Sequence, residues 1–171
     1  MKYTNLKNLG LTLLVMTVAS TLVSAQSKQK SADEMKYLRN DSIILADMIN
    51  PQERDAQSNG QEPDWEGMRA NILLKYDGVA ADRAVTKARI YYYYSKDWAL
   101  FATAIVHFTE AYEDKEDLNL MNKNAKFILR YSQNPKEWKM AQAWVKHAVD
   151  KDPSNAGYKE TWDALEAKIK G

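Results

Sequence analysis

The sequence contains no cysteine and only two histidines among its 171 residues. Without cysteine the chain can form no disulfide, thiolate nucleophile, cysteine-ligated metal site or thioredoxin-type redox motif. It also lacks a glycine-rich phosphate loop, a Ser-His-Asp arrangement and a His-Glu-x-x-His motif. Because these common signatures of catalysis are missing, we expect no catalytic residue, no cofactor, no metal and no enzyme activity.

The sequence also has little excess of charge. It holds 24 basic and 23 acidic residues, for a formal net charge of +1. If the first 25 residues are removed, Lys2 and Lys7 leave with them, and 22 basic residues face 23 acidic ones. Nucleic acid and anionic membranes attract proteins with a strong positive charge. We therefore expect neither of them as a general partner.

The first 25 residues have the pattern of a secretory signal. Residues 1–8 are basic, residues 9–22 are nearly all apolar, and Val23-Ser24-Ala25 places small residues before a cut at Gln26. The alternatives are a membrane anchor or a buried helix, but a membrane-spanning helix needs about 20 apolar residues. We predict a cleaved signal peptide over 1–25 and an exported protein, periplasmic or secreted, with no stable membrane anchor after cleavage.

A polar stretch divides the rest of the chain. Apolar residues recur at helical spacing up to Asn50-Pro51, which we expect to end a first helix. Residues 51–64 hold two prolines, a glycine and almost no apolar residue, which predicts a linker or long loop. We therefore expect an N-terminal helix and polar linker over 26–64, with the helix either docked or loosely attached, and a helical repeat domain over 65–171.

Residues 65–171 have the periodicity of amphipathic helices throughout. Asp64 and Asp97 have the character of N-terminal caps, and Gly78 is expected to end a helix in the left-handed conformation. Residues 90–94 have strand propensity, but they complete a helical stripe, so we expect a helix there. The sequence predicts an all-α fold of about seven helices. The segments expected after the linker are 65–76, 81–92, 98–112, 118–129, 138–148 and 158–169.

Two segments of the chain are similar in sequence and indicate an internal repeat. Residues 96–108 align with residues 136–148 at an offset of 40, so that Trp98 falls on Trp138 and His107 on His147. Each segment follows another amphipathic helix through a turn, which indicates two copies of a helix–turn–helix unit. One such hairpin cannot bury its own apolar face, so repeated hairpins stack. We expect stacked antiparallel helical hairpins.

The second copy carries a family resemblance. The order small, large, small and then a helix-ending proline is typical of the second helix of a tetratricopeptide repeat, and here it is formed by Ala141, Val145, Ala148 and Pro153. Residues 118–153 therefore resemble such a repeat. Leu129 and Ser132 depart from the family pattern, which has a small residue and an aromatic residue there. The resemblance implies a solenoid fragment in which the first helix of each repeat lines a concave groove.

A second resemblance concerns exported bacterial proteins. The stretch IYYYYSKDW and the two helices after it look like the helical region that follows the thioredoxin-like domain in some of these proteins. The thioredoxin-like domain and its Cys-x-x-Cys motif have no counterpart in this chain. The resemblance therefore implies the helical scaffold alone, without redox activity.

The candidate binding residues are basic and aromatic. Lys123, Lys126 and Arg130 recur at spacings of three and four and so share one helix face. The tetratricopeptide resemblance implies a groove that includes this face and suits a protein or peptide partner with acidic groups or a free carboxylate. An ordinary solvated face and tyrosines packed on a neighbouring helix remain the alternatives. The predicted partner-binding residues are Arg83, Tyr93, Tyr94, Lys123, Lys126 and Arg130.

Metal binding and acid–base catalysis have weaker support in the sequence. The two histidines have no second histidine three or four residues away, and the acids of residues 110–117 lie in a charged turn. Residues 152–163 resemble a calcium loop only in part, because Ala156 offers no oxygen ligand. We expect an exported, non-catalytic helical-repeat module that binds a protein or peptide. The alternatives are a structural or accessory subunit of an envelope assembly and, less favoured, an enzyme of unrecognised type.

Overall fold

The computed structural model describes residues 32–171. The predicted signal peptide over residues 1–25 lies outside the described residues. The chain divides into two compact units, Met1–Arg39 and Asn40–Gly171. Helix α2 (Ala32–Ile44) begins in the first unit and ends in the second. The account below concerns the second unit.

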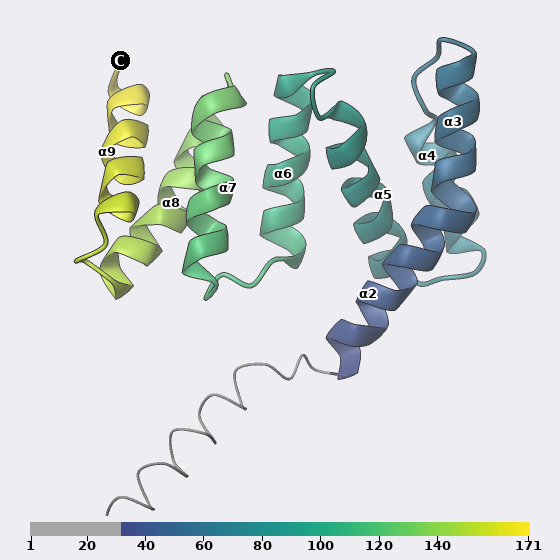
Figure 1. Ribbon diagram of the computed structural model, residues 1–171, viewed down its shortest axis with the longest axis horizontal. Helices are drawn as coiled ribbons and strands as arrows, with labels where there is room; N and C mark the ends of the chain where they lie inside the picture. The colour runs from purple at the N-terminus through teal and green to yellow at the C-terminus, as the bar shows by residue number, and fades with distance from the viewer. Residues whose placement is uncertain (1–31) are drawn as a thin grey trace, which may run out of the picture. The chain divides into compact units, whose positions relative to one another are not determined.

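Helices make up all the regular structure of the described residues (Figure 1). The first three helical elements, α2, a π-helical turn and α3, follow one another without a break and are counted here as one helix. The described residues then form seven helices, which confirms the all-α prediction. Residues 90–93 belong to a helix, as expected. The elements are α2 (Ala32–Ile44), the π-helix (Leu45–Ile49), α3 (Asn50–Ser58), α4 (Trp65–Leu73), α5 (Gly78–Tyr93), α6 (Trp98–Tyr112), α7 (Leu118–Tyr131), α8 (Pro135–Lys151) and α9 (Ala156–Lys170).

The predicted loop over residues 51–58 is wrong, because these residues form α3. A proline lacks the amide hydrogen that a helix interior needs, and its ring crowds the preceding turn. Here the π-helical turn Leu45–Ile49 precedes Pro51, and the amide of Asn50 bonds to the carbonyl of Leu45, five residues back. The wider turn lets the helix continue with Pro51 in the first turn of α3. The helix ends at Ser58, before Gly60 with a φ of 68°.

Aspartate or asparagine caps the start of every helix from α4 to α9. Asp64 and Asp97 do so as predicted, since their side chains accept hydrogen bonds from backbone amides of the first turn. Gly78, expected to stop a helix, instead begins α5, and its φ is not positive. Ser95, in the turn between α5 and α6, is left-handed instead, with a φ of 65°. The full set of caps is Asp64, Asp77, Asp97, Asp117, Asn134 and Asn155.

Helices α5 to α9 pack in sequence as antiparallel neighbours, which confirms the expected hairpin packing (Figure 1). One core cluster joins the end of α5 to α6, α7, α8 and α9 around fully buried residues such as Met121, Ile128 and Leu165. A second cluster joins α2, the π-helix, α4 and α5 around Ile44, Ile49 and other residues. The part of the first helix that carries Ile44 and Ile49 is therefore docked in the core rather than loosely attached.

No helix in the described part of the chain is both long and apolar enough to cross a lipid bilayer.

Candidate functional site

The three predicted cations of α7 lie on the exposed side of that helix. Lys123, Lys126 and Arg130 are exposed, whereas Met121, Asn124, Ala125 and Ile128 form its buried side. Helix α7 contains no acidic residue. None of the three cations forms an ion pair with another residue in the range that the structure describes. The face therefore presents three positive charges with no acid of the described residues within ion-pair distance.

The placement expected for Arg83 is wrong. Its side chain is 14 % exposed, and its Nε donates a 3.0 Å hydrogen bond to Asp41, whose side chain is fully buried. Lys87 lies 3.6 Å from the same carboxylate oxygen. Asp41 lies on α2, and a buried charge is tolerated only when it is paired and hydrogen-bonded. Arg83 therefore ties the first helix to α5 instead of pointing into an open groove.

The placement expected for Tyr93 is also wrong, because its side chain is buried. Its hydroxyl donates a hydrogen bond to Glu62 and accepts one of 3.2 Å from the Nε1 of Trp65. Burial raises the pKa of the Tyr93 phenol, and the hydrogen bond to Glu62 raises it further. The helical register of α5 alone gave no sign of Trp65 and Glu62, which come from a distant part of the chain.

Tyr94, by contrast, is 58 % exposed and belongs to an aromatic cluster at the start of α6. Its ring meets the rings of Trp98 and Phe101 edge-on. The Trp98 ring lies flat against Tyr131 of α7, with 4.2 Å between the ring centroids and 9° between the planes. The guanidinium of Arg130 lies 5.3 Å from the centre of the Tyr131 ring. The cluster thus connects Tyr94 with Arg130.

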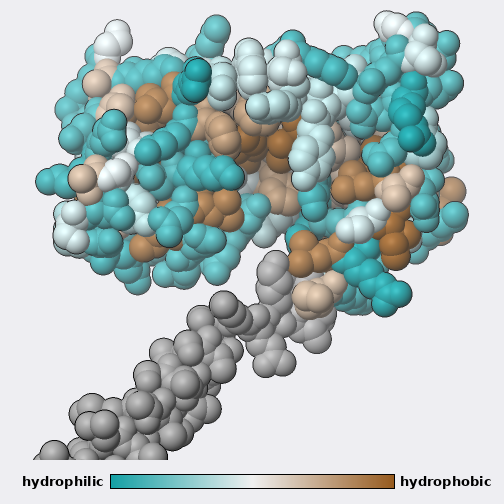
Figure 2. Space-filling model, in the orientation of Figure 1, coloured by the Kyte–Doolittle hydropathy of each residue, from teal (hydrophilic) through white to brown (hydrophobic). Residues whose placement is uncertain are grey.

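We call the set Tyr94, Trp98, Lys126, Arg130 and Tyr131 the aromatic–basic surface. Figure 2 shows pale and brown side chains gathered over α6 and the adjoining end of α5, next to hydrophilic side chains over α7. Trp98, at the start of a helix predicted to be amphipathic, is 37 % exposed. The turn at Ser95 and the cap at Asp97 start α6 so that Trp98 stacks on the next helix pair.

The six predicted residues therefore do not form one continuous groove. Tyr94, Lys123, Lys126 and Arg130 remain at the surface, whereas Arg83 and Tyr93 are held inside by other partners. Helix α7 packs on α6, α8 and α9, and α5 is not one of its principal neighbours. The two helices expected to line one groove are therefore separated by α6.

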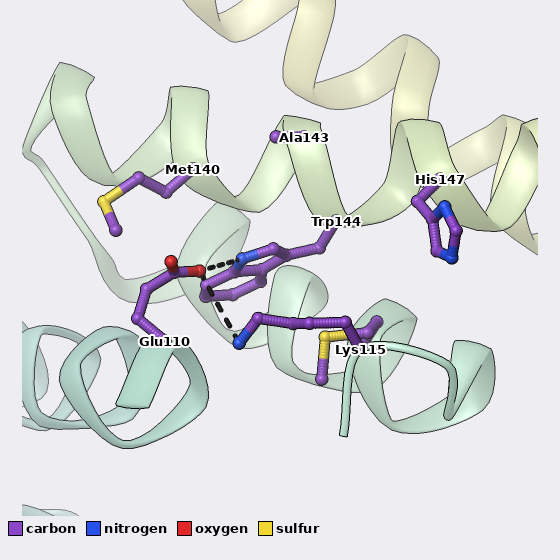
Figure 3. Close-up of a pocket in the computed structure, with 7 residues that line it drawn as sticks. Glu110, Lys115, Met140, Ala143, Trp144 and His147 are labelled. Carbon is purple, nitrogen blue, oxygen red and sulfur yellow. Dashed lines mark hydrogen bonds and ion pairs between the residues drawn. The ribbon is translucent and has the colours of Figure 1, made fainter. Parts of the chain in front are cut away.

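A pocket of about 300 Å³ lies where α6, α7 and α8 meet (Figure 3). Its apolar lining comes from Met121, Met140, Ala143 and Trp144, and Glu110, Lys115 and His147 complete it. The indole of Trp144 donates a hydrogen bond to the Glu110 carboxylate. Nζ of Lys115 lies 3.8 Å from the same carboxylate oxygen and donates a hydrogen bond to the carbonyl of Thr109. Sequence reasoning missed this pocket, because its walls come from separate helices.

Neither histidine has the surroundings of a metal ligand. His147 lies beside Glu116, with 3.0 Å between Nε2 and Oε1, and Nδ1 of exposed His107 lies 3.4 Å from the hydroxyl of Thr86. Among the residues that the structure describes, no three histidine or acidic side chains gather in a way that could hold a metal ion. In the charged turn after α6, burial raises the pKa of Glu113.

The chain matches no protein family, and no curated protein or solved structure is significantly similar to it. Evidence for function therefore comes from the fold, from the aromatic–basic surface and from the pocket between α6, α7 and α8.

Proposed function

We propose that this protein is an exported, non-catalytic helical-repeat module that binds an acidic segment of a protein partner on the aromatic–basic surface. The observation that carries the proposal is the stack of the exposed Trp98 ring of α6 on the half-buried Tyr131 ring of α7, beside Arg130. Helix α7 itself has three cations and no acid. Rigid aromatic rings and arginine side chains contribute strongly to protein interfaces. Export rests on the signal-like pattern of residues 1–25.

The repeat interpretation has support in the packing of the C-terminal helices. Ala141, Val145 and Ala148, which carry the tetratricopeptide resemblance, are all fully buried. Small residues at such positions let neighbouring helices approach closely. Helix α7 also packs on α9, which is expected when the first helix of one unit lies against the first helix of the next. In this interpretation α9 is the closing cap.

The spacing of the cations suggests the form of the ligand. Lys123 and Arg130 are seven residues apart, which is about 10 Å along a helix axis. An extended peptide covers the same distance in about three residues. Because side chains alternate between the two faces of an extended peptide, two acidic residues four positions apart, about 13 Å, point the same way. A segment with this spacing would reach both ends of the basic row through the long cationic side chains. An apolar side chain next to them would lie on the Trp98–Tyr131 stack.

Fluorescence anisotropy with a labelled peptide of this pattern tests the proposal. We expect binding that weakens at high salt, and at least a tenfold loss with the double variant Lys126→Glu/Arg130→Glu. The control variant Lys75→Glu/Lys159→Glu reverses two exposed lysines elsewhere and should bind normally. Equal binding of a peptide with amides in place of its acids would refute the proposal. Loss of helicity in the double variant, seen by circular dichroism, would show instead that the two residues are structural.

A second candidate function has one specific observation in its favour. Leu73, Leu74 and Val79, around the turn between α4 and α5, are 39 %, 82 % and 51 % exposed. Exposed apolar residues in a group are typical of subunit contacts. A structural subunit that pairs with a second copy through this turn would sediment as a dimer, and Leu74→Lys would make it a monomer. A wild-type protein that is monomeric at high concentration would exclude this candidate.

A further inference from the structure

The pocket between α6, α7 and α8 is separate from the aromatic–basic surface and has different chemistry. Its floor and walls are apolar, because Met121, Met140, Ala143 and Trp144 form them. A dry cavity of about 150 Å³ is enough to hold a benzene molecule. The volume here, about 300 Å³, is therefore enough for a small aromatic or branched aliphatic group.

The polar edge of this pocket attracts positive charge. Near the end of α6, Nζ of Lys115 lies beside the Glu110 carboxylate (Figure 3). The same Nζ donates a hydrogen bond to the carbonyl of Thr109. Carbonyl groups at the end of a helix carry partial negative charge, which favours a cation there. The chain thus already places an ammonium group of its own beside the apolar walls.

The surrounding charges strengthen this preference. Residues 110–117 contain five acids and one lysine. Across the pocket, Lys151 lies 3.8 Å from Glu116, and His147 faces the same carboxylate. These two groups face Glu116, and Arg83 and Lys87 act on Glu113, so Lys115 is the one cation of the described residues within ion-pair distance of Glu110. An anionic ligand would be repelled from this edge, whereas a cationic ligand would be attracted.

Lys115 is held in a way that permits exchange. It lies in the turn between α6 and α7, its side chain is 38 % exposed, and it extends along the pocket to Glu110 (Figure 3). An incoming ammonium group could take its place beside Glu110 while Lys115 moves into solvent. The Glu110 oxygen would keep its hydrogen bond from the indole of Trp144. No part of the apolar core has to move for this exchange.

We infer that this pocket is a binding site for a small apolar amine. The apolar body of the ligand lies against Met121, Met140 and Trp144, where methionine sulfur and the indole ring make favourable contacts with an aromatic group. The ammonium group lies between the Glu110 carboxylate and the Thr109 carbonyl, in place of Lys115. The inference does not depend on the proposed peptide-binding function, because the two sites share no residue.

The test uses the full mature chain with ¹³C-labelled methionine methyl groups, observed by NMR. Three probes have the same ring and differ in charge: benzylamine, toluene and benzoate. We expect benzylamine to shift the methyl signals of Met121 and Met140 in a saturable way, with an affinity at least tenfold above that of benzoate and above that of toluene. The variants Met121→Leu and Met140→Leu assign the two signals.

Variants at the edge of the pocket separate this site from general hydrophobic binding. Glu110→Gln keeps an acceptor for Trp144 but removes the charge, and it should weaken benzylamine about tenfold while leaving toluene unchanged. Lys115→Ala should strengthen benzylamine severalfold, because it removes the internal competitor. Lys146→Ala, an exposed lysine on α8 paired with Asp150, is the control and should change nothing. The inference is overturned if benzoate binds as well as benzylamine, or if neither the wild type nor Lys115→Ala shows a saturable shift.

Discussion

The buried carboxylate of Asp41 gives the sharpest test of how the first helix is held. Asp41 is fully buried and faces two cations, Arg83 at 3.0 Å and Lys87 at 3.6 Å. Replacing Asp41 with Asn keeps the size of the side chain but removes the buried negative charge that both cations face. Removing one partner of a buried ion pair costs about 3–5 kcal/mol. The side chains of Arg83 and Lys87 are 14 % and 25 % exposed, so water can reach them. We therefore expect a loss of about 2–3 kcal/mol of unfolding free energy.

Urea unfolding followed by circular dichroism measures this loss. With a slope of about 1.5 kcal/mol per molar urea, the midpoint should fall by about 1.3–2 M. Asp47→Asn is the matched control, since Asp47 lies on the same continuous helix but is exposed, and it should change stability by less than about 0.5 kcal/mol. An Asp41→Asn midpoint within the error of the control would refute the structural role of the ion pair.

A double-mutant cycle extends the test to Arg83. If Arg83 acts mainly through Asp41, Arg83→Met should add little to the loss already caused by Asp41→Asn. Arg83→Met should also leave peptide binding on the aromatic–basic surface unchanged. If a folded Arg83→Met protein lost most of its peptide binding, Arg83 would instead belong to the binding surface, as the sequence first indicated.

Two further changes have clear expected signs. Ser95→Gly should stabilise the protein by up to about 1 kcal/mol in thermal or urea unfolding, because glycine accepts the φ of 65° without the cost that serine bears; a destabilised variant would contradict this. Glu113→Gln should stabilise it at pH 7. Burial raises the pKa of Glu113 above its ordinary value of 4.5. As the pH rises, Glu113 therefore loses its proton more easily in the unfolded state than in the native state, and at a pH above both pKa values the charged carboxylate destabilises the native state. The gain should disappear below pH 4, and an equal gain at both pH values would contradict this cause.

The helices were predictable because their signals are local. Asp64 and Asp97 lie directly before apolar stripes, and a capping side chain needs only the amides of the next three residues. The prediction from local sequence that the first helix ends at Asn50-Pro51 was wrong. There a π-helical turn, invisible in the pattern of apolar residues, lets the helix continue through the proline. Gly78 was misinterpreted for a related reason, because Asp77 before it caps the following helix.

The candidate site was less predictable, because burial depends on which neighbour covers each face. Tyr93 and Tyr94 are adjacent in sequence, yet one is buried under Trp65 and the other is open. A helical wheel for α5 cannot show this, since Trp65 comes from another helix. The cations of α7 were identified correctly as a shared face because their spacing alone determines it. Whether they bind a partner remains a prediction.

Although the net charge of the chain is near neutral, acids and cations are separated locally between the end of α6 and α7. Five acids and one lysine occupy residues 110–117, directly before α7, whereas α7 itself has three cations and no acid. Part of this pattern complements the helix dipole, which favours acids near the start and cations near the end. That explanation fits Asp117 and Arg130, but it does not require Lys123 and Lys126 in the middle turns. The remaining asymmetry gives the two sites opposite preferences. The aromatic–basic surface should select acidic segments and the pocket should select amines, so each class of ligand is a negative control for the other site.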